Sequence, residues 1–253
     1  MSDSSAALAA KLGARIDAGR LESEPFDHVY LEDVFPPEVY RALLDSLPAT
    51  GIYSELQHPD AMRPDGSSAR RKLPLYLEHL LFLPPAQRAF WRHLSRVLRS
   101  RDVQVAFKRK FRAALERRFG RGIDALWFRP NIMLVRDLEG YRIGIHADVL
   151  RKAITVQFYL PRDGAQAHLG THFHDGRDGE AAQRVKAMPF RPNSAYAFPV
   201  SRDESWHSVP PTVAADGERN TLMMTYYVRD RFADRLASLR SRVMEFARRI
   251  AGR

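Results

Sequence analysis

The chain of 253 residues contains no cysteine. Disulfides, zinc–thiolate sites, iron–sulfur clusters and cysteine nucleophiles are therefore excluded, and any metal must be held by histidine and carboxylate side chains. Long apolar runs are also missing, because no stretch reaches the roughly 18 residues that span a bilayer. The first residues lack the basic start, apolar stretch and cleavage site of a secretory signal. We therefore expect a cytoplasmic protein with no membrane partner.

Acidic residues are outnumbered in this chain. Its 40 lysines and arginines against 30 aspartates and glutamates give a formal net charge of +10. Much of the excess is arginine in 88–121 and after residue 229. We interpret these regions as solvated helix faces, with a preference for an anionic small-molecule substrate. Nucleic-acid binding is the alternative, but no recognisable nucleic-acid motif accompanies the charge, so we expect no such partner.

The length and an apolar content of 45% are typical of a globular protein with one large core. We predict a single domain over 1–253 that begins with a mainly helical part over 1–122. Within it, the first twenty residues resemble a loose or marginally helical tail. Residues 54–74 are rich in Pro, Gly, Ser and charge, which predicts a long loop. Long loops in compact domains are often functional, so this one is expected to shape the substrate side of a site.

After Gly122 the pattern changes to short β-rich runs separated by turn residues. These runs are 127–135, 153–160, 194–200 and 221–228. Because no helices alternate with them, they favour an antiparallel sandwich or barrel over a parallel α/β fold. From residue 230 the helical spacing returns, with apolar residues along one stripe. We predict a C-terminal helix over 230–253 that packs on the core or forms the face of a homodimer.

The segment that carries chemistry contains His146 and Asp148, two residues apart. In an extended chain both side chains leave the same face, so one imidazole and one carboxylate can bind a single ion. His207, in the segment SWHSVPPT, can supply a third ligand. Two histidines and one carboxylate on one face of an octahedral ion are typical of non-haem iron(II) oxygenases. The three residues are therefore predicted to be metal ligands.

Such an ion keeps open positions that a bidentate 2-oxo acid and dioxygen can fill. The far carboxylate of 2-oxoglutarate then needs a planar cation, and the guanidinium fork of arginine matches it. Arg219 follows His207 and opens the strand RNTLMMTYYV, which a turn would bring back beside that histidine. Thr221 points to the same face and can add a hydroxyl. We predict that both residues bind 2-oxoglutarate.

Taken together, these segments resemble the iron(II)/2-oxoglutarate-dependent dioxygenases, especially the prolyl-4-hydroxylase-like branch. The resemblance covers about 127–228. It rests on the H-x-D pair, the strand AITVQFYLP after it, and four later matches: Gly170, Thr171 and Phe173; Ala197, Phe198 and Pro199; His207, Val209 and Pro211; Gly217 and Arg219.

This resemblance implies a mainly β core over 123–229, folded as a double-stranded β-helix (jelly roll) and flanked by N-terminal and C-terminal α-helices. It implies iron(II) as cofactor, 2-oxoglutarate and O2 as co-substrates, and release of succinate and CO2. It further implies hydroxylation of an unactivated C–H bond. We expect a small-molecule or natural-product substrate, while a free amino acid, a carrier-bound intermediate and a protein side chain stay open. Tyr159 lies where a tyrosine of that family often hydrogen-bonds the 2-oxoglutarate carboxylate.

Several alternatives stay open at this level. His172 and His174 also have metal-ligand spacing, which would suit a cupin-type metal enzyme. A β-helix that keeps the metal for binding or sensing, without turnover, is a second alternative. Asn131 is a polar residue within an apolar strand, so it either satisfies a core hydrogen bond or contacts 2-oxoglutarate. Arg151 and Lys152 are expected to be solvated.

Overall fold

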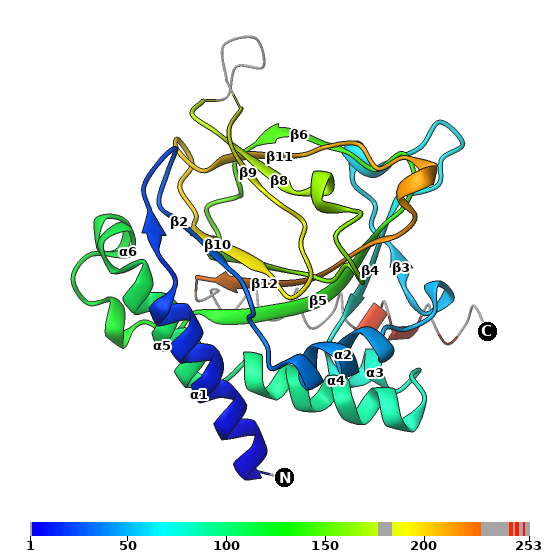
Figure 1. The fold of residues 1–253 in the computed structure, drawn as a ribbon, viewed down its shortest axis with the longest axis horizontal. Coiled ribbons are helices and arrows are strands. Elements are labelled where there is room, and N and C mark those ends of the chain that lie inside the picture. The colour runs from blue at the N-terminus through cyan, green and yellow to red at the C-terminus, as the bar shows by residue number, and fades with distance from the viewer. Residues whose placement is uncertain (1, 177–183, 229–242, 245, 248–249, 251–253) are drawn as a thin grey trace.

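Two antiparallel sheets face one another in the computed structural model, and helices cover the outer face of the larger sheet (Figure 1). The structure describes residues 2–176 and 184–228, together with 243–244, 246–247 and 250. The C-terminal helix predicted over 230–253, and the dimer face assigned to it, therefore lie largely outside the described residues. No helix in the described part of the chain is long and apolar enough to cross a membrane.

The larger sheet has eight strands in the order β1-β2-β10-β7-β12-β5-β4-β3. Their bounds are β1 (Leu21–Glu22), β2 (His28–Leu31), β10 (Ala195–Pro199), β7 (Lys152–Tyr159), β12 (Arg219–Tyr227), β5 (Arg129–Asp137), β4 (Arg70–Pro74) and β3 (Ser54–Glu55). The smaller sheet has four strands in the order β6-β11-β8-β9. Their bounds are β6 (Ile143–His146), β11 (Trp206–Val209), β8 (Thr171–His174) and β9 (Arg184–Met188).

Six α-helices precede β5 in the chain. They are α1 (Ser2–Ala18), α2 (Pro37–Asp45), α3 (Leu77–Leu80), α4 (Pro85–Leu98), α5 (Arg101–Lys110) and α6 (Arg112–Phe119). Short 3-10 helices lie in the connections: η1 (Thr50–Ile52), η2 (Pro59–Ala61), η3 (Ile123–Ala125), η4 (Ala167–Leu169) and η5 (Ala214–Asp216). Figure 1 shows the helices gathered on the side of the large sheet away from the small sheet.

Alternation along the central strands separates the helix-facing core from the space between the sheets. In β7, Ile154, Val156 and Phe158 belong to the large core that includes the helices. The residues between them face the small sheet, and Tyr159 belongs to a second core with Phe173 and other aromatic side chains. Every residue of β7 except the first is buried, because both faces are covered.

The sequence interpretation is confirmed for the main strands and corrected for two segments. The predicted strands correspond to β5, β7, β10 and β12. The first twenty residues are not a loose tail, because α1 packs on α4 and α5 and buries Leu8, Leu12 and Ile16 along one stripe. Residues 54–74 are not a plain loop, since β4 at their end pairs with β5 in the large sheet.

Many of the arginines in 88–121 serve the fold. Arg118 donates to the backbone carbonyls of Lys152 and Val200, both at 2.7 Å, and so ties α6 to the large sheet. Arg112 forms ion pairs with Glu116 and Asp124, at 2.9 and 2.8 Å.

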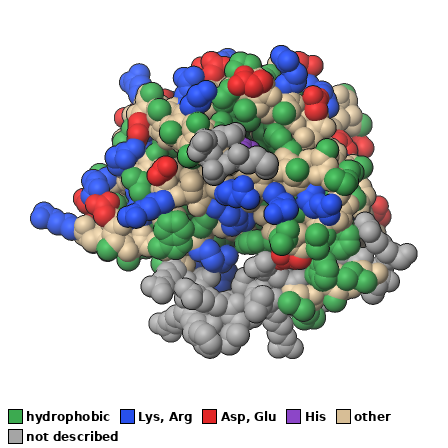
Figure 2. All heavy atoms as spheres, turned by 90° about the horizontal axis from the view of Figure 1, so that it is seen from below, with side chains coloured by type: hydrophobic (Ala, Val, Ile, Leu, Met, Phe, Trp, Pro, Cys, Tyr) green, Lys and Arg blue, Asp and Glu red, His purple; other side chains and the backbone are tan. Residues whose placement is uncertain are grey.

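On the face drawn in Figure 2, lysine and arginine side chains form a band across the middle, with acidic side chains mainly toward the edges.

Candidate metal centre

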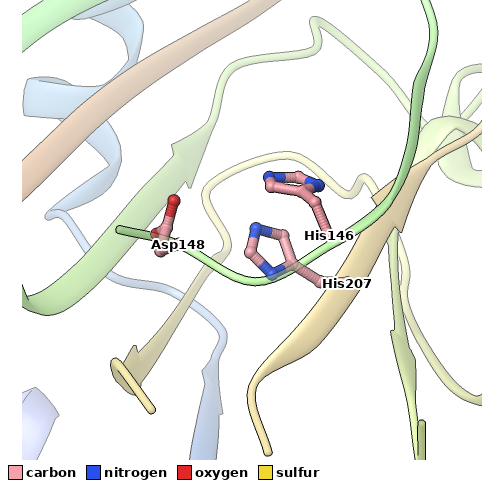
Figure 3. Close-up of side chains that lie close together, drawn as sticks. All are labelled: His146, Asp148 and His207. Carbon is pink, nitrogen blue, oxygen red and sulfur yellow. The ribbon is translucent and has the colours of Figure 1, made fainter. Parts of the chain in front are cut away.

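The three predicted metal ligands lie close together (Figure 3), in a pocket lined by residues of both sheets. His146 ends β6, His207 lies opposite it in β11, and Asp148 follows two residues after His146. One potential ligand atom from each residue lies within 4.8 Å of the others. The two imidazole rings have their centroids 4.2 Å apart. The sequence prediction that these residues form one site thus agrees with the geometry.

Both histidines are held in the tautomer that metal binding needs. Nδ1 of His146 lies 3.0 Å from the carbonyl oxygen of Gly144, and Nδ1 of His207 lies 2.9 Å from that of Ser205. A carbonyl oxygen only accepts, so each Nδ1 carries the proton and Nε2 keeps its lone pair for a metal. A hydrogen bond of this kind from the other ring nitrogen commonly fixes the orientation of a metal-binding histidine.

The carboxylate of Asp148 is buried and kept ionised by its surroundings. Burial by itself would raise the pKa of Asp148, but the ammonium of Lys152 and the neighbouring His207 hold that pKa well below its ordinary value. Lys152 forms an ion pair with one carboxylate oxygen, and the hydroxyl of Thr155 donates to the other at 2.5 Å. The expectation that Lys152 is solvated is wrong, because only 20% of its side chain is exposed.

Two imidazoles and one ionised carboxylate are a donor set that fits a divalent transition metal such as iron(II). Three protein ligands would leave further coordination positions of such an ion open to small molecules. The ligands line a pocket of about 420 Å³, a volume typical of small-molecule sites. Its wall also includes Leu56, Arg70, Tyr141, Ile143, Gln157, Val209 and Met223.

Arg219 lies deeper between the sheets than this pocket. It is fully buried, with Nη1 donating to Asp137 at 2.8 Å and Nε donating to the carbonyl oxygen of Leu169 at 2.9 Å. Its Nη2 has no hydrogen-bond partner among the described residues, and neither has the hydroxyl of Thr221. Met223, the next residue on this face of β12, lines the pocket. Buried polar atoms without partners are costly, so these atoms point to a polar ligand.

Tyr159 is the strand partner of Thr221 and is also fully buried. Its hydroxyl lies 3.0 Å from the hydroxyl of Thr171 and accepts a hydrogen bond from the Thr171 backbone at 2.9 Å. Burial raises the pKa of Tyr159 to about 12, so it stays neutral. The guanidinium of Arg219 lies 5.6 Å from the centre of its ring. The structure thus places Tyr159 beside Arg219 and Thr221.

Asn131 lies apart from this group. Its amide oxygen accepts a hydrogen bond from the hydroxyl of Tyr76 at 2.8 Å, and it does not line the pocket. It sits six residues before Asp137 on β5, a distance of roughly 20 Å along an extended strand. The geometry therefore favours the structural explanation of Asn131 over a contact with 2-oxoglutarate.

The cupin-type alternative finds no support in the placement of β8. Phe173 lies opposite His207 and belongs to the core between the sheets. His172 and His174 flank Phe173, so their side chains leave the other face of the strand. They are separated from the three predicted ligands by the sheet itself.

Arg70 and Asp137 were not predicted from the sequence. Asp137 forms ion pairs with both arginines: its carboxylate oxygens lie 3.0 Å from Arg70 Nε and 2.8 Å from Arg219 Nη1. Burial by itself would lower the pKa of Arg70, but Asp137 and Tyr141 raise it above its ordinary value. Arg70 is followed by Arg71 and Lys72. The sequence of this run does not indicate which of the basic side chains points into the space between the sheets.

No protein-family model and no curated protein matches the chain. Solved structures do resemble it. A prolyl-4-hydroxylase from Pseudomonas putida superposes with a TM-score of 0.53 at 14% identity, covering 86% of this chain and 99% of the other. The chain has a prolyl-4-hydroxylase-like fold.

Two further structures share this prolyl-4-hydroxylase-like fold. The non-haem α-ketoglutarate-dependent epimerase SnoN from nogalamycin biosynthesis has a TM-score of 0.50 at 14% identity, covering 88% of this chain and 83% of the other. The α-ketoglutarate-dependent carbocyclase SnoK from nogalamycin biosynthesis has a TM-score of 0.51 at 11% identity, covering 80% of each chain. At these identities the likeness establishes the fold, and function must be argued from the site.

The metal-free protein is expected to lose stability in mild acid. Burial and the neighbouring His146 lower the pKa of His207 to about 4, against 6.5 in an unfolded chain. Between these values only the unfolded chain takes up the proton, so lowering the pH favours unfolding. The separation corresponds to roughly 3 kcal/mol in the free energy of unfolding. Urea unfolding of chelator-treated protein at about pH 7 and about pH 4 measures this loss.

A His207→Asn variant should show a clearly smaller loss between the two pH values, because the lowered pKa has been removed. His58→Asn is a matched control, since the side chain of His58 is 51% exposed. That control should lose as much stability as the unsubstituted protein. Equal losses in all three proteins would contradict the prediction.

Proposed function

We propose that this protein is an iron(II)- and 2-oxoglutarate-dependent oxygenase that hydroxylates an unactivated C–H bond of a small-molecule substrate. The single observation that carries the proposal is the set His146, Asp148 and His207 at the wall of a small-molecule pocket. The buried polar atoms without partners on Arg219 and Thr221 support the 2-oxoglutarate part.

Each residue has a defined task in this proposal. His146, Asp148 and His207 would hold iron(II), with the Nε2 atoms free because both Nδ1 atoms donate to backbone carbonyls. Arg219 would donate from Nη2 to the distal carboxylate of 2-oxoglutarate, with the hydroxyl of Thr221 and the neutral Tyr159 beside it. When bound, iron(II) and 2-oxoglutarate supply the oxidising chemistry, which consumes O2 and yields succinate and CO2.

The protein contributes position and exclusion of water. The aromatic side chains between the sheets close the deep end of the site, and Tyr159, Phe173, Phe190, Tyr196 and Phe198 belong to this core. In such a dry environment an arginine–carboxylate contact is stronger than in water. The epimerase SnoN and the carbocyclase SnoK share this fold, so identification of the product is the test of hydroxylation itself.

Succinate formation tests the general proposal. Purified protein with Fe(II) and 2-oxoglutarate in air should form succinate slowly even without an added substrate. The signal should vanish under nitrogen and after chelation of the metal. If 2-oxoglutarate binds but succinate never forms in air, the alternative of a binding or sensing β-helix is favoured instead. If 2-oxoglutarate does not bind in a metal-dependent manner, the proposal fails.

Arg219→Lys should raise the concentration of 2-oxoglutarate needed for half-saturation by about 10-fold or more. A lysine keeps the charge near Asp137 but loses the fork, and a hydrogen bond to a charged group contributes about 1.5–3 kcal/mol. Calorimetric titration of the metal-loaded protein with 2-oxoglutarate measures the change. The affinity for the metal itself should change less than about threefold, because Arg219 is not a ligand.

Arg191→Lys is a matched control for this titration, since Arg191 pairs with Glu32 and both side chains are more than half exposed. Its half-saturation should equal that of the unsubstituted protein. An unchanged requirement for 2-oxoglutarate in Arg219→Lys would remove Arg219 from the co-substrate site.

A further inference from the structure

Arg70 lines the pocket that contains the predicted metal ligands, whereas Arg219 does not line it. Arg70 is the first residue of β4 and lies opposite Asp137 of β5. Only 11% of its side chain is exposed, and it lines the pocket together with the three ligands. Arg71, the next residue along β4, points to the other face and pairs with Glu55.

Part of the Arg70 guanidinium is already held in place. Nε pairs with Asp137, Nη1 donates to the hydroxyl of Tyr141, and the group lies 4.6 Å from the centre of the Tyr141 ring. Nη2 makes no hydrogen bond with any residue that the structure describes. A guanidinium fixed on one side, with a donor remaining on the other, is pre-organised to bind an acceptor.

The charges around the pocket leave Arg70 without a full counter-charge. One carboxylate, Asp137, is shared by Arg70 and Arg219, and the charge of Lys152 is balanced by Asp148. A bound dication and the two negative charges of bound 2-oxoglutarate would cancel each other. One positive charge therefore remains near the pocket, and a buried charge is costly unless a partner compensates it. Asp60 also lines the pocket, but its side chain is 48% exposed.

Part of the pocket wall is apolar. It includes Leu56, Ala61, Ile143, Val209 and Met223. Such a wall suits a hydrocarbon body, and a cationic group in it fixes the orientation of the ligand. Leu56, Ala61 and Arg70 all come from the segment 54–74, so one segment would supply both the charge and part of the apolar surface.

We propose that Arg70 recognises a carboxylate on the organic substrate, and that the substrate is an organic acid with an apolar body. The proposal rests on the proposed function in one respect, because it assigns 2-oxoglutarate to Arg219 and leaves Arg70 for the substrate. The planar fork of Arg70 matches a carboxylate, and Tyr141 keeps the fork oriented.

A matched pair of probes tests the proposal. Hexanoate and 1-hexanol share an apolar body and differ in charge. Ligand-observed NMR titrations use zinc-loaded protein saturated with 13C-labelled 2-oxoglutarate, whose own signals report displacement. Hexanoate should bind at least about 10-fold more tightly than 1-hexanol, as expected for a charged hydrogen bond, and it should not displace 2-oxoglutarate. Equal binding of the two probes, or displacement of 2-oxoglutarate by hexanoate, would overturn the proposal.

Three variants locate the effect. Arg70→Gln should weaken hexanoate binding by about 10-fold or more and change 1-hexanol binding less than twofold. Arg70→Lys keeps the positive charge beside Asp137, so this variant should fold even if Arg70→Gln does not. Because lysine lacks the planar fork, the variant should bind hexanoate with intermediate affinity. Arg71→Gln removes the same charge from the other face of β4 and should bind hexanoate like the unsubstituted protein.

The outcomes separate this proposal from the proposed function. If Arg70→Gln and Arg70→Lys weaken 2-oxoglutarate binding and leave hexanoate binding unchanged, Arg70 belongs to the co-substrate and the present proposal is wrong. If the unsubstituted protein does not bind 2-oxoglutarate in a metal-dependent manner, the proposed function fails. The probe titrations are then repeated on the metal-free protein, where the preference for hexanoate and its dependence on Arg70 are still expected.

Discussion

Asp148→Ala should reduce the affinity for Fe(II) by at least about 100-fold and lower succinate formation to background. Asp148 is the one carboxylate of the predicted ligand set, and its pKa lies well below the ordinary value, so it offers a full negative charge to the metal. Loss of a residue that only orients a ligand already costs about 10- to 100-fold. Loss of the ligand itself should cost at least the upper value. Anaerobic titration with Fe(II) and a succinate assay in air measure the two effects.

Two further variants make this result specific. Asp148 also binds Lys152 and Thr155, so its loss could disturb the fold as well as the metal. His146→Ala removes a ligand whose Nδ1 contacts only a nearby backbone carbonyl, and it should lose Fe(II) in the same way. His172→Ala is the control, because His172 lies on the far face of β8. If His172→Ala lost the metal while His146→Ala kept it, the cupin-type alternative would be favoured.

The pair His146 and Asp148 could be proposed as ligands from the sequence because its information is local. The H-x-D spacing places two side chains on one face of an extended chain, whatever the rest of the fold does. The long strands β5, β7, β10 and β12 could be predicted for a similar reason, since each is a run of apolar and β-branched residues between turn residues. Arg219 could be proposed because it opens one of these strands.

The strands and the arginine that complete the site could not be predicted in this way. β4 reads RRKLP, which has no apolar alternation, and it is a strand only because it pairs with β5, whose paired residues lie about sixty positions later. The small sheet is built from strands of four or five residues, too short for a clear period. The inward direction of Arg70 and the burial of Asp137 follow from this pairing, so they are properties of the tertiary structure.

The helix α1 was underestimated for a different reason. Its buried positions, Leu8, Leu12 and Ile16, are four residues apart, but alanines and polar residues fill most of the remaining positions. Such a helix is marginal by itself, and its stability comes from packing. Gly13 lies against α5, where a Cβ at Gly13 would be 3.8 Å from Ala106. The contact that makes α1 a regular helix is therefore with residues far along the chain.

Asp137→Asn should lower the free energy of unfolding by about 3–5 kcal/mol. The carboxylate is fully buried and is shared by Arg70 and Arg219, of which Arg219 is also fully buried. Replacing it by a neutral amide of nearly the same shape leaves two guanidinium charges without an anion, and removal of one partner of a buried ion pair has costs of this size. Urea unfolding near pH 7 measures the change.

Glu55→Gln is the matched control for this effect. It removes a carboxylate from the neighbouring β3–β4 pair, where Glu55 and Arg71 form an ion pair at 3.2 Å with side chains 33% and 25% exposed. Surface pairs that water reaches in this way contribute about 0–1 kcal/mol, because water screens the charges. A small effect in Glu55→Gln and a large one in Asp137→Asn would show that the stability depends on the buried arginine–aspartate–arginine arrangement. Equal small effects would mean that water or another group already compensates Arg70 and Arg219, which would weaken the case for an anionic ligand at either residue.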